Sequence, residues 1–146
     1  MITRKEFMTK LVDDYGLVPE EDIFKLPIGG KTIAIITRSG IEKIQFANNI
    51  SVGFEVCLLG GGPSGNMAAV IKATAKKGEV FMESFGEAEV GVNCRSPYPI
   101  AMAEKRALAR VVLKITGAYK FGVFGEDESD DFKQENKGER KLQAKR

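Results

Sequence analysis

The chain begins with a segment in which apolar side chains return at the period of an α-helix. The apolar positions there are Phe7, Met8, Leu11, Val12 and Tyr15. Steps of three and four residues place such side chains on one face of a helix. Thr3 supplies an N-cap and Gly16 a stop signal. The pattern therefore predicts a short amphipathic helix over residues 3–15.

Strand-forming patterns dominate the middle of the chain. After a loop through Pro19 and Pro27, the β-branched run TIAIITR at residues 32–38 favours a strand, and residues 41–48 favour a second helix. Three more segments with strand composition follow, joined by the glycine-rich GGGPSG and by a Lys-Lys-Gly turn. They predict a three-stranded antiparallel meander over residues 51–59, 66–75 and 79–86.

A long amphipathic helix follows the meander. Ser96 and Pro99 mark its start, and Gly117 marks its end. At about 100° per residue, its aliphatic side chains share one broad arc, which must face the core. The arc consists of Ile100, Ala107, Leu108, Val111, Val112 and Ile115. The next segment, AYKFGVFG, adds either a strand or an ordered loop.

These elements predict one α+β domain over residues 1–126. Its core is β-β-β-α: an N-terminal helix, then a three- to four-stranded antiparallel meander packed against the long C-terminal helix. From Glu126 the composition becomes acidic (EDESDD) and then polar with mixed charge. We interpret residues 127–146 as a disordered charged tail whose acidic block can screen a basic face or contact a partner.

The amino-acid composition limits the kinds of site that the chain can form. The 146 residues are 43% hydrophobic with a formal net charge of only +2, so total charge does not identify a nucleic-acid binder. The chain has no histidine, and its two cysteines, Cys57 and Cys94, lie far apart, so neither a metal site nor a cofactor is predicted. The N-terminus is too charged for a signal peptide and no apolar run can cross a bilayer, which favours a soluble cytoplasmic protein.

Two glycine-rich segments resemble phosphate-binding loops without meeting the pattern. GGKT at residues 29–32 would need its first glycine at Lys25, and the β-branched run after it favours a strand instead of a helix. The run GGGPSG at residues 60–65 lacks the following Lys-Ser or Lys-Thr. Neither segment predicts nucleotide hydrolysis, and a turn before a strand explains the first.

The long helix carries a basic row just outside its apolar arc. Arg106, Arg110 and Lys114 are spaced i, i+4 and i+8, so they lie above one another. Like charges at this spacing repel by a few tenths of a kcal/mol per pair, a cost that bound phosphates would offset. A merely solvated face is the alternative. Further cations on the strands, turns and neighbouring helices can join the row in a groove between sheet and helix: Arg38, Lys43, Lys72, Lys76, Lys77 and Arg95.

From about residue 40 to 117, the order of elements resembles the single-strand annealing proteins of homologous recombination, which include the Rad-fifty-two, Redβ, Erf and Sak types. A helix (GIEKIQFANN) leads to a strand (ISVGFEV), a hairpin, the segment GEAEVG, and a long helix with KRAL at its middle. In that family a Lys-Arg-Ala-Leu-Arg helix lines a positively charged groove. Lys105, Arg106, Ala107 and Leu108 match it directly, whereas Ala109 displaces the next arginine to Arg110.

The resemblance implies a non-catalytic, ATP-independent protein of phage or mobile-element origin that anneals complementary single DNA strands in recombination and repair. It implies homo-oligomeric rings or filaments, and contact with a single-stranded DNA-binding protein or a recombinase through the tail. The expected DNA-binding residues are Lys105, Arg106, Arg110, Lys114, Arg38, Lys43, Lys72 and Arg95.

Three other functions remain open from the sequence. A double-stranded RNA-binding domain shares the α-β-β-β-α order, but its basic residues stand at the N-terminus of its last helix. A non-catalytic homo-oligomeric interaction protein would use the row for ion pairs between subunits. An enzyme would use Glu83, Glu87 and Glu89, although no nucleophile or metal ligand accompanies them.

Overall fold

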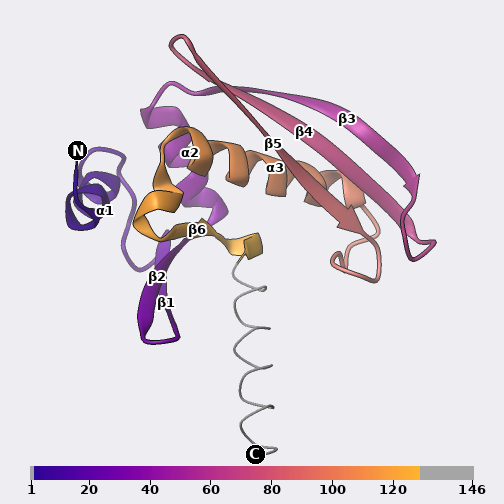
Figure 1. Ribbon diagram of the computed structural model, residues 1–146, viewed down its shortest axis with the longest axis horizontal. Helices are drawn as coiled ribbons and strands as arrows, with labels where there is room; N and C mark the ends of the chain where they lie inside the picture. Colours follow the sequence, from indigo (N-terminus) through magenta and orange to yellow (C-terminus); the bar gives the residue numbers. More distant parts are fainter. Residues whose placement is uncertain (1, 129–146) are drawn as a thin grey trace, which may run out of the picture.

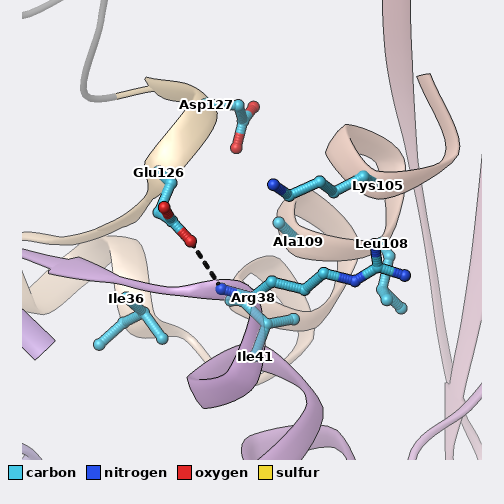
Figure 2. Close-up of a pocket in the computed structure, with 8 residues that line it drawn as sticks. All are labelled: Ile36, Arg38, Ile41, Lys105, Leu108, Ala109, Glu126 and Asp127. Atoms are coloured by element: carbon cyan, nitrogen blue, oxygen red, sulfur yellow. Dashed lines mark hydrogen bonds between the residues drawn. The ribbon is translucent and has the colours of Figure 1, made fainter. Parts of the chain in front are cut away.

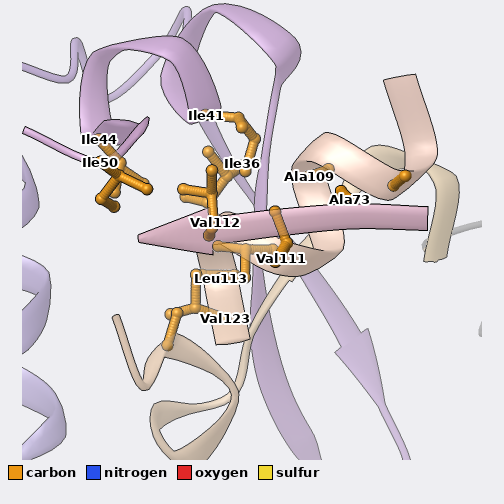
Figure 3. Packing of buried hydrophobic residues seen from close by; sticks show 14 of the residues in the cluster. Ile36, Ile41, Ile44, Ile50, Ala73, Ala109, Val111, Val112, Leu113 and Val123 are labelled. Atoms are coloured by element: carbon orange, nitrogen blue, oxygen red, sulfur yellow. The ribbon is translucent and has the colours of Figure 1, made fainter. Parts of the chain in front are cut away.

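Helix α3 (Pro99–Ile115) lies between two sheets in the computed structural model, which describes residues 2–128. A β3-β4-β5 sheet arches over one side of α3, and a smaller β1-β2-β6 sheet and helix α2 lie on the other side (Figure 1). The helix accordingly buries two sets of side chains. One comprises Ala103, Ala107 and Val111, and the other Ala109, Val112 and Leu113. Figure 3 shows the second set meeting residues of β2, α2 and β6.

The N-terminal helix α1 (Arg4–Asp13) begins at the predicted cap. Thr3 accepts a hydrogen bond from the Glu6 amide, and the Glu6 side chain accepts from the Thr3 amide, which completes a capping box. Its apolar face is anchored by Leu11, which is fully buried, and by Phe7, whose ring stacks on Phe121 at a centroid distance of 4.6 Å. The sequence prediction for this helix is confirmed.

The small sheet contains a strand that the sequence pattern did not predict. β1 (Ile23–Ile28) pairs antiparallel with β2 (Lys31–Ile36), and β6 (Val123–Gly125) lies parallel to β2. Gly29 and Gly30 both have positive φ, as a two-residue hairpin turn requires. The segment through Pro27 was predicted to be a loop, but β1 is an edge strand, where proline is tolerated. The glycine pair that resembled a phosphate loop is this hairpin turn.

Helix α2 (Arg38–Ala47) begins earlier than the sequence pattern predicted. Thr37 is its N-cap and accepts a hydrogen bond from the Gly40 amide. The predicted strand over residues 32–38 therefore ends at Ile36, and Arg38 is the first helical residue. The prediction that Arg38 lies on a strand is wrong, because the Thr37 hydroxyl stabilises a helix start at this point.

The antiparallel meander is confirmed and is longer than predicted. It consists of β3 (Ser51–Gly61), β4 (Met67–Lys77) and β5 (Val80–Glu89), with β4 in the centre. Its face toward α3 carries small side chains, including Ala69, Ala73 and Ala75. On β5 this face presents Gly86 directly beneath the helix backbone at Ala103 and Ala107. Small residues thus let α3 approach the sheet closely.

The C-terminal boundary differs from the sequence prediction by a few residues. After α3, the 3₁₀ turn η1 (Ala118–Phe121) leads into β6, and residues 126–128 form a helical turn packed on the domain. Asp127 and Glu128, which were assigned to the tail, therefore belong to the folded part. The rest of the predicted tail, residues 129–146, lies outside the described residues. Within residues 2–128 no helix is long and apolar enough to span a bilayer.

Gly86→Ala tests the close approach of α3 to the sheet. A Cβ at this position would lie 2.5 Å from the Ala107 amide nitrogen and closer still to the Ala103 carbonyl oxygen, so the helix must move. We expect the free energy of unfolding to fall by roughly 1–3 kcal/mol, the usual cost of overpacking. Urea denaturation measures this loss. Gly53→Ala on β3 is the matched control, because a Cβ at that position would meet no atom within 4 Å; an equal loss in both variants contradicts the prediction.

Candidate nucleic-acid interface

The basic row, Arg106, Arg110 and Lys114, runs along the outer edge of strand β5. Each side chain donates a hydrogen bond to a backbone carbonyl oxygen of alternate β5 residues. The pairs are Arg106 with Glu87 (2.7 Å), Arg110 with Phe85 (2.8 Å) and Lys114 with Glu83 (2.9 Å). The row therefore satisfies acceptors that an edge strand otherwise leaves to water.

The fit of the row to the strand follows from helix and strand dimensions. Four residues of an α-helix rise about 6.0 Å, and two residues of an antiparallel strand about 6.8 Å. Side chains at i, i+4 and i+8 can therefore reach carbonyls at j, j−2 and j−4 when helix and strand run antiparallel, as α3 and β5 do. The row predicted from the sequence is held on one line by the sheet.

The three cations differ in the charges that surround them. Arg110 forms ion pairs with Glu87 (2.9 Å) and with Asp127 (3.2 Å). Arg106 hydrogen-bonds to the carbonyl oxygens of Glu87 and Asn93, and Lys114 to that of Glu83. Within residues 2–128, no carboxylate lies within ion-pair distance of Arg106 or Lys114. The ends of the row therefore keep their charge, while its centre is neutralised.

Asp127 is the buried acid of this interface. Its side chain is only 10% exposed, and its Oδ2 atom receives no hydrogen bond from the described residues although Arg110 Nε lies 3.2 Å away. Burial raises the pKa of Asp127, and the neighbouring Arg110 charge only partly opposes this. Glu128 beside it also has a pKa raised by burial, and it accepts a hydrogen bond from the Tyr119 hydroxyl (2.9 Å).

Lys105 and Arg38 lie on the other side of α3, where they line a pocket with residues of the acidic turn (Figure 2). Glu126 accepts a hydrogen bond from the Arg38 amide at 2.8 Å, and the Arg38 side chain pairs with Glu42 on the same helix (3.3 Å). Asp127 belongs to both sites. It lines this pocket, and it forms an ion pair with Arg110 of the basic row. The charged residues that line this pocket are Arg38, Lys105, Glu126 and Asp127.

Arg95 follows the loop residue that Arg106 contacts. It is exposed and stands two residues after Asn93, whose carbonyl oxygen accepts a hydrogen bond from Arg106. Among the described residues Arg95 has no ion pair or hydrogen-bond partner. Its guanidinium is therefore not bound by another described residue.

Two of the predicted DNA-binding residues lie away from the row. Lys43 binds the buried carboxylate of Asp22 at 2.6 Å; burial opposes ionisation of Asp22, but the hydrogen bond from Lys43 helps to lower its pKa. Lys72 lies on the face of the sheet opposite α3, since its neighbours Ile71 and Ala73 face the helix. The predicted groove between sheet and helix therefore does not include Lys43 or Lys72, because Lys43 pairs with Asp22 and Lys72 points to the opposite face of the sheet.

Lys72 is instead part of a charge cluster across the outer face of the sheet. It pairs with Glu55 on β3 (3.2 Å) and lies 3.9 Å from Glu83 on β5. The hydrogen bond to Glu55 is the main reason that the pKa of Lys72 is raised. The three glutamates considered for an enzyme are also separated: Glu83 contacts Lys72, Glu87 pairs with Arg110, and buried Glu89 accepts a hydrogen bond from the Ser64 amide.

Sequence reasoning missed the acceptors that fix the row. Backbone carbonyls carry no signal in the sequence. The sequence suggests only a catalytic role for Glu87. Composition places Asp127 in the tail, although it also predicts that the acidic block can screen a basic face. The period-two alternation of β4, with Lys72 between two core residues, was the one available signal that would have excluded Lys72.

Comparisons with known proteins do not identify the chain. No protein-family model matches it, and no curated protein matches its sequence. Within the described part of the chain, no group of acidic or cysteine side chains is arranged to hold a metal ion.

Asp127→Asn is expected to stabilise the fold at neutral pH. Because burial raises the folded-state pKa of Asp127, the protonated carboxyl stabilises the fold below the ordinary value of 3.8, and this contribution is lost as the pH rises through the folded-state value. The neutral asparagine amide removes the cost of burying a charged carboxylate. The free energy of unfolding should therefore rise by about 1 kcal/mol at pH 7.

Urea denaturation across pH measures this effect. The gain should shrink as the pH falls toward 3.8, where the wild-type carboxyl is neutral as well. Glu79→Gln in the exposed β4–β5 turn is the control and should change little at any pH. A destabilised Asp127→Asn at pH 7 would show that its ion pair with Arg110 outweighs the burial cost.

Proposed function

We propose that this protein binds single-stranded DNA along the basic row and anneals complementary strands without ATP, as a non-catalytic homo-oligomer. The observation that carries the proposal is the line of Arg106, Arg110 and Lys114 along β5, with both ends bound only to neutral carbonyls. Cations fixed in a line suit a sugar-phosphate backbone, whose charges are also spaced along a line. Arg95, two residues after the Asn93 that Arg106 contacts, adds a further exposed cation to this part of the surface.

Rigidity is what makes the row suitable for annealing. Two complementary strands repel each other until cations neutralise their phosphates. Each carbonyl contact on β5 fixes the direction of a long side chain and so reduces the conformational entropy that phosphate binding must still remove. An arginine bound to two carbonyls retains donors for a phosphate. The row thus offers preorganised charge rather than a set of freely moving side chains.

The remaining cations have different places in this proposal. Lys105 and Arg38 lie across α3 from the row and flank the acidic turn, where a bound strand that passes over residues 126–128 would meet them. Lys43 and Lys72 take no part, because each is paired with a carboxylate elsewhere. Nucleotide hydrolysis has no role, and the glycine pair that resembled a phosphate loop serves as a hairpin turn.

Lys114→Gln tests the proposal with little risk to the fold. Lys114 is exposed, and glutamine keeps an amide donor of nearly the same length while it removes the charge. We expect about a tenfold loss of affinity for a single-stranded oligonucleotide, equivalent to ~1.4 kcal/mol. The slope of log affinity against log salt should fall by about 0.7, the value for one phosphate contact on a single strand. Fluorescence anisotropy measures both quantities.

Lys72→Gln is the matched control, because it makes the same change on the opposite face of the sheet. It should leave affinity and salt slope unchanged. Equal losses in both variants would place the DNA elsewhere, and no binding at low salt would refute the proposal. Annealing of two complementary labelled strands should slow in parallel with the loss of affinity, and competition with duplex RNA separates this function from that of a double-stranded RNA-binding domain.

Asp127→Asn should also tighten DNA binding. Its carboxylate lies 3.2 Å from Arg110 Nε and repels phosphates that approach the row. Removing the charge is expected to raise affinity about threefold at low salt, with a smaller effect at high salt. Asp14→Asn, on the exposed C-cap of α1, changes net charge equally and is the control. An equal gain in both variants would show that only net charge matters.

A further inference from the structure

Strand β3 presents a long open edge. It is 11 residues long, and its order in the sheet leaves one side without a neighbouring strand in the described chain. Open edges expose unpaired amide and carbonyl groups to any strand that can pair with them. The edge also lacks proline, lysine and arginine, the residues that commonly prevent such pairing.

The other sheet edges in residues 2–128 are each protected. β5 is covered by the basic row, whose side chains bind its outward carbonyls. β1 carries Lys25 and Pro27, and β6 is three residues long. Against these, β3 is the long edge that carries no proline or basic side chain and no covering element, although its pairing with β4 shifts register between Val56 and Leu58.

Apolar side chains of β3 are exposed on the same face of the sheet as α3. Phe54, Val56 and Leu59 pair with Ala73, Ile71 and Ala69, which face the helix. They remain 42%, 52% and 56% exposed, because α3 lies over β4 and β5 and scarcely reaches β3. In Figure 1, β3 is the strand at the far rim of the arch from β5. An apolar strip therefore runs beside the open backbone edge.

We infer that β3 pairs antiparallel with β3 of a second copy of this chain, so that the two sheets become one. The edge of β5 cannot take the role of partner, since its carbonyls are already bound, and a β3–β3 pair is self-complementary. The single charge on β3, Glu55, is neutralised by Lys72 at 3.2 Å, so no like charges oppose each other in the pair. A two-fold axis perpendicular to the sheet joins the two apolar strips.

The pair leaves both basic rows free at the outer edges of the joined sheet. It does not depend on nucleic-acid binding, and it adds a specific pairing mode to the homo-oligomer proposed above. Such a contact closes on itself, so any larger assembly would use further surfaces.

Val56→Lys tests the pairing. The charge stands at the middle of the open edge, where a second copy would bring an identical charge close by. In the presence of a reductant and without DNA, sedimentation should show wild-type protein at twice the 16.0 kDa chain mass and the variant at the single-chain mass. Val80→Lys is the matched control, because Val80 is 51% exposed on β5 and the substitution is the same. The control should retain the wild-type mass.

Hydrogen exchange of peptides covering residues 51–61 provides a second readout that does not require a folded variant. In the wild type these amides should exchange slowly and become faster on dilution to the single chain. The wild type could also form an assembly larger than a dimer. If Val56→Lys breaks that assembly into smaller units, the β3–β3 pair is one of its interfaces. The inference is overturned by a single-chain wild type with fast exchange in β3, or by an assembly that neither variant or both variants disrupt.

Discussion

The close contact between helix α3 and strand β5 determines the rest of the structure. Gly86 has no side chain beneath the helix backbone, and alanines line the neighbouring strand β4. Because the helix lies so near the strand, side chains four residues apart on α3 can reach carbonyl oxygens two residues apart on β5. The same contact buries Ala103, Ala107 and Val111 and aims the cations, whereas Ile100 of the predicted apolar arc remains 40% exposed. A larger residue at position 86 would therefore disturb both the core and the basic row.

The sequence predicted the parts of this fold that depend on local patterns. Thr3 specifies the start of α1, strand-forming composition and turn residues specify the meander, and apolar periodicity specifies α3. Proline at position 27 argued against β1 because the pattern does not reveal that this strand lies at an edge. The Thr37 cap similarly starts α2 at Arg38 instead of residue 41, so Arg38 lies in the helix and not in the strand. Local signals therefore located the elements but not always their ends.

The candidate interface was only partly predictable, and the reason is physical. The spacing of Arg106, Arg110 and Lys114 is a property of the helix alone, so the row could be found. Its acceptors are backbone groups of a distant strand, which no residue type reports. The sequence does not reveal that Lys43 pairs with Asp22, because only the folded chain brings the two together. Lys43 therefore looks available for the interface from the sequence alone. Lys72 could have been excluded, since the strand alternation places it opposite Ile71 and Ala73.

Strand β6 lies parallel to β2, and Val123 is paired there with Ala34. The meander and α3 form from neighbouring segments, but the small sheet joins segments from opposite ends of the described chain. During synthesis the β1–β2 hairpin must wait for the last strand, and contacts between such distant residues form late because a long loop has to close first. The basic helix can thus be in place on its sheet before the N-terminal third of the protein acquires its final neighbour.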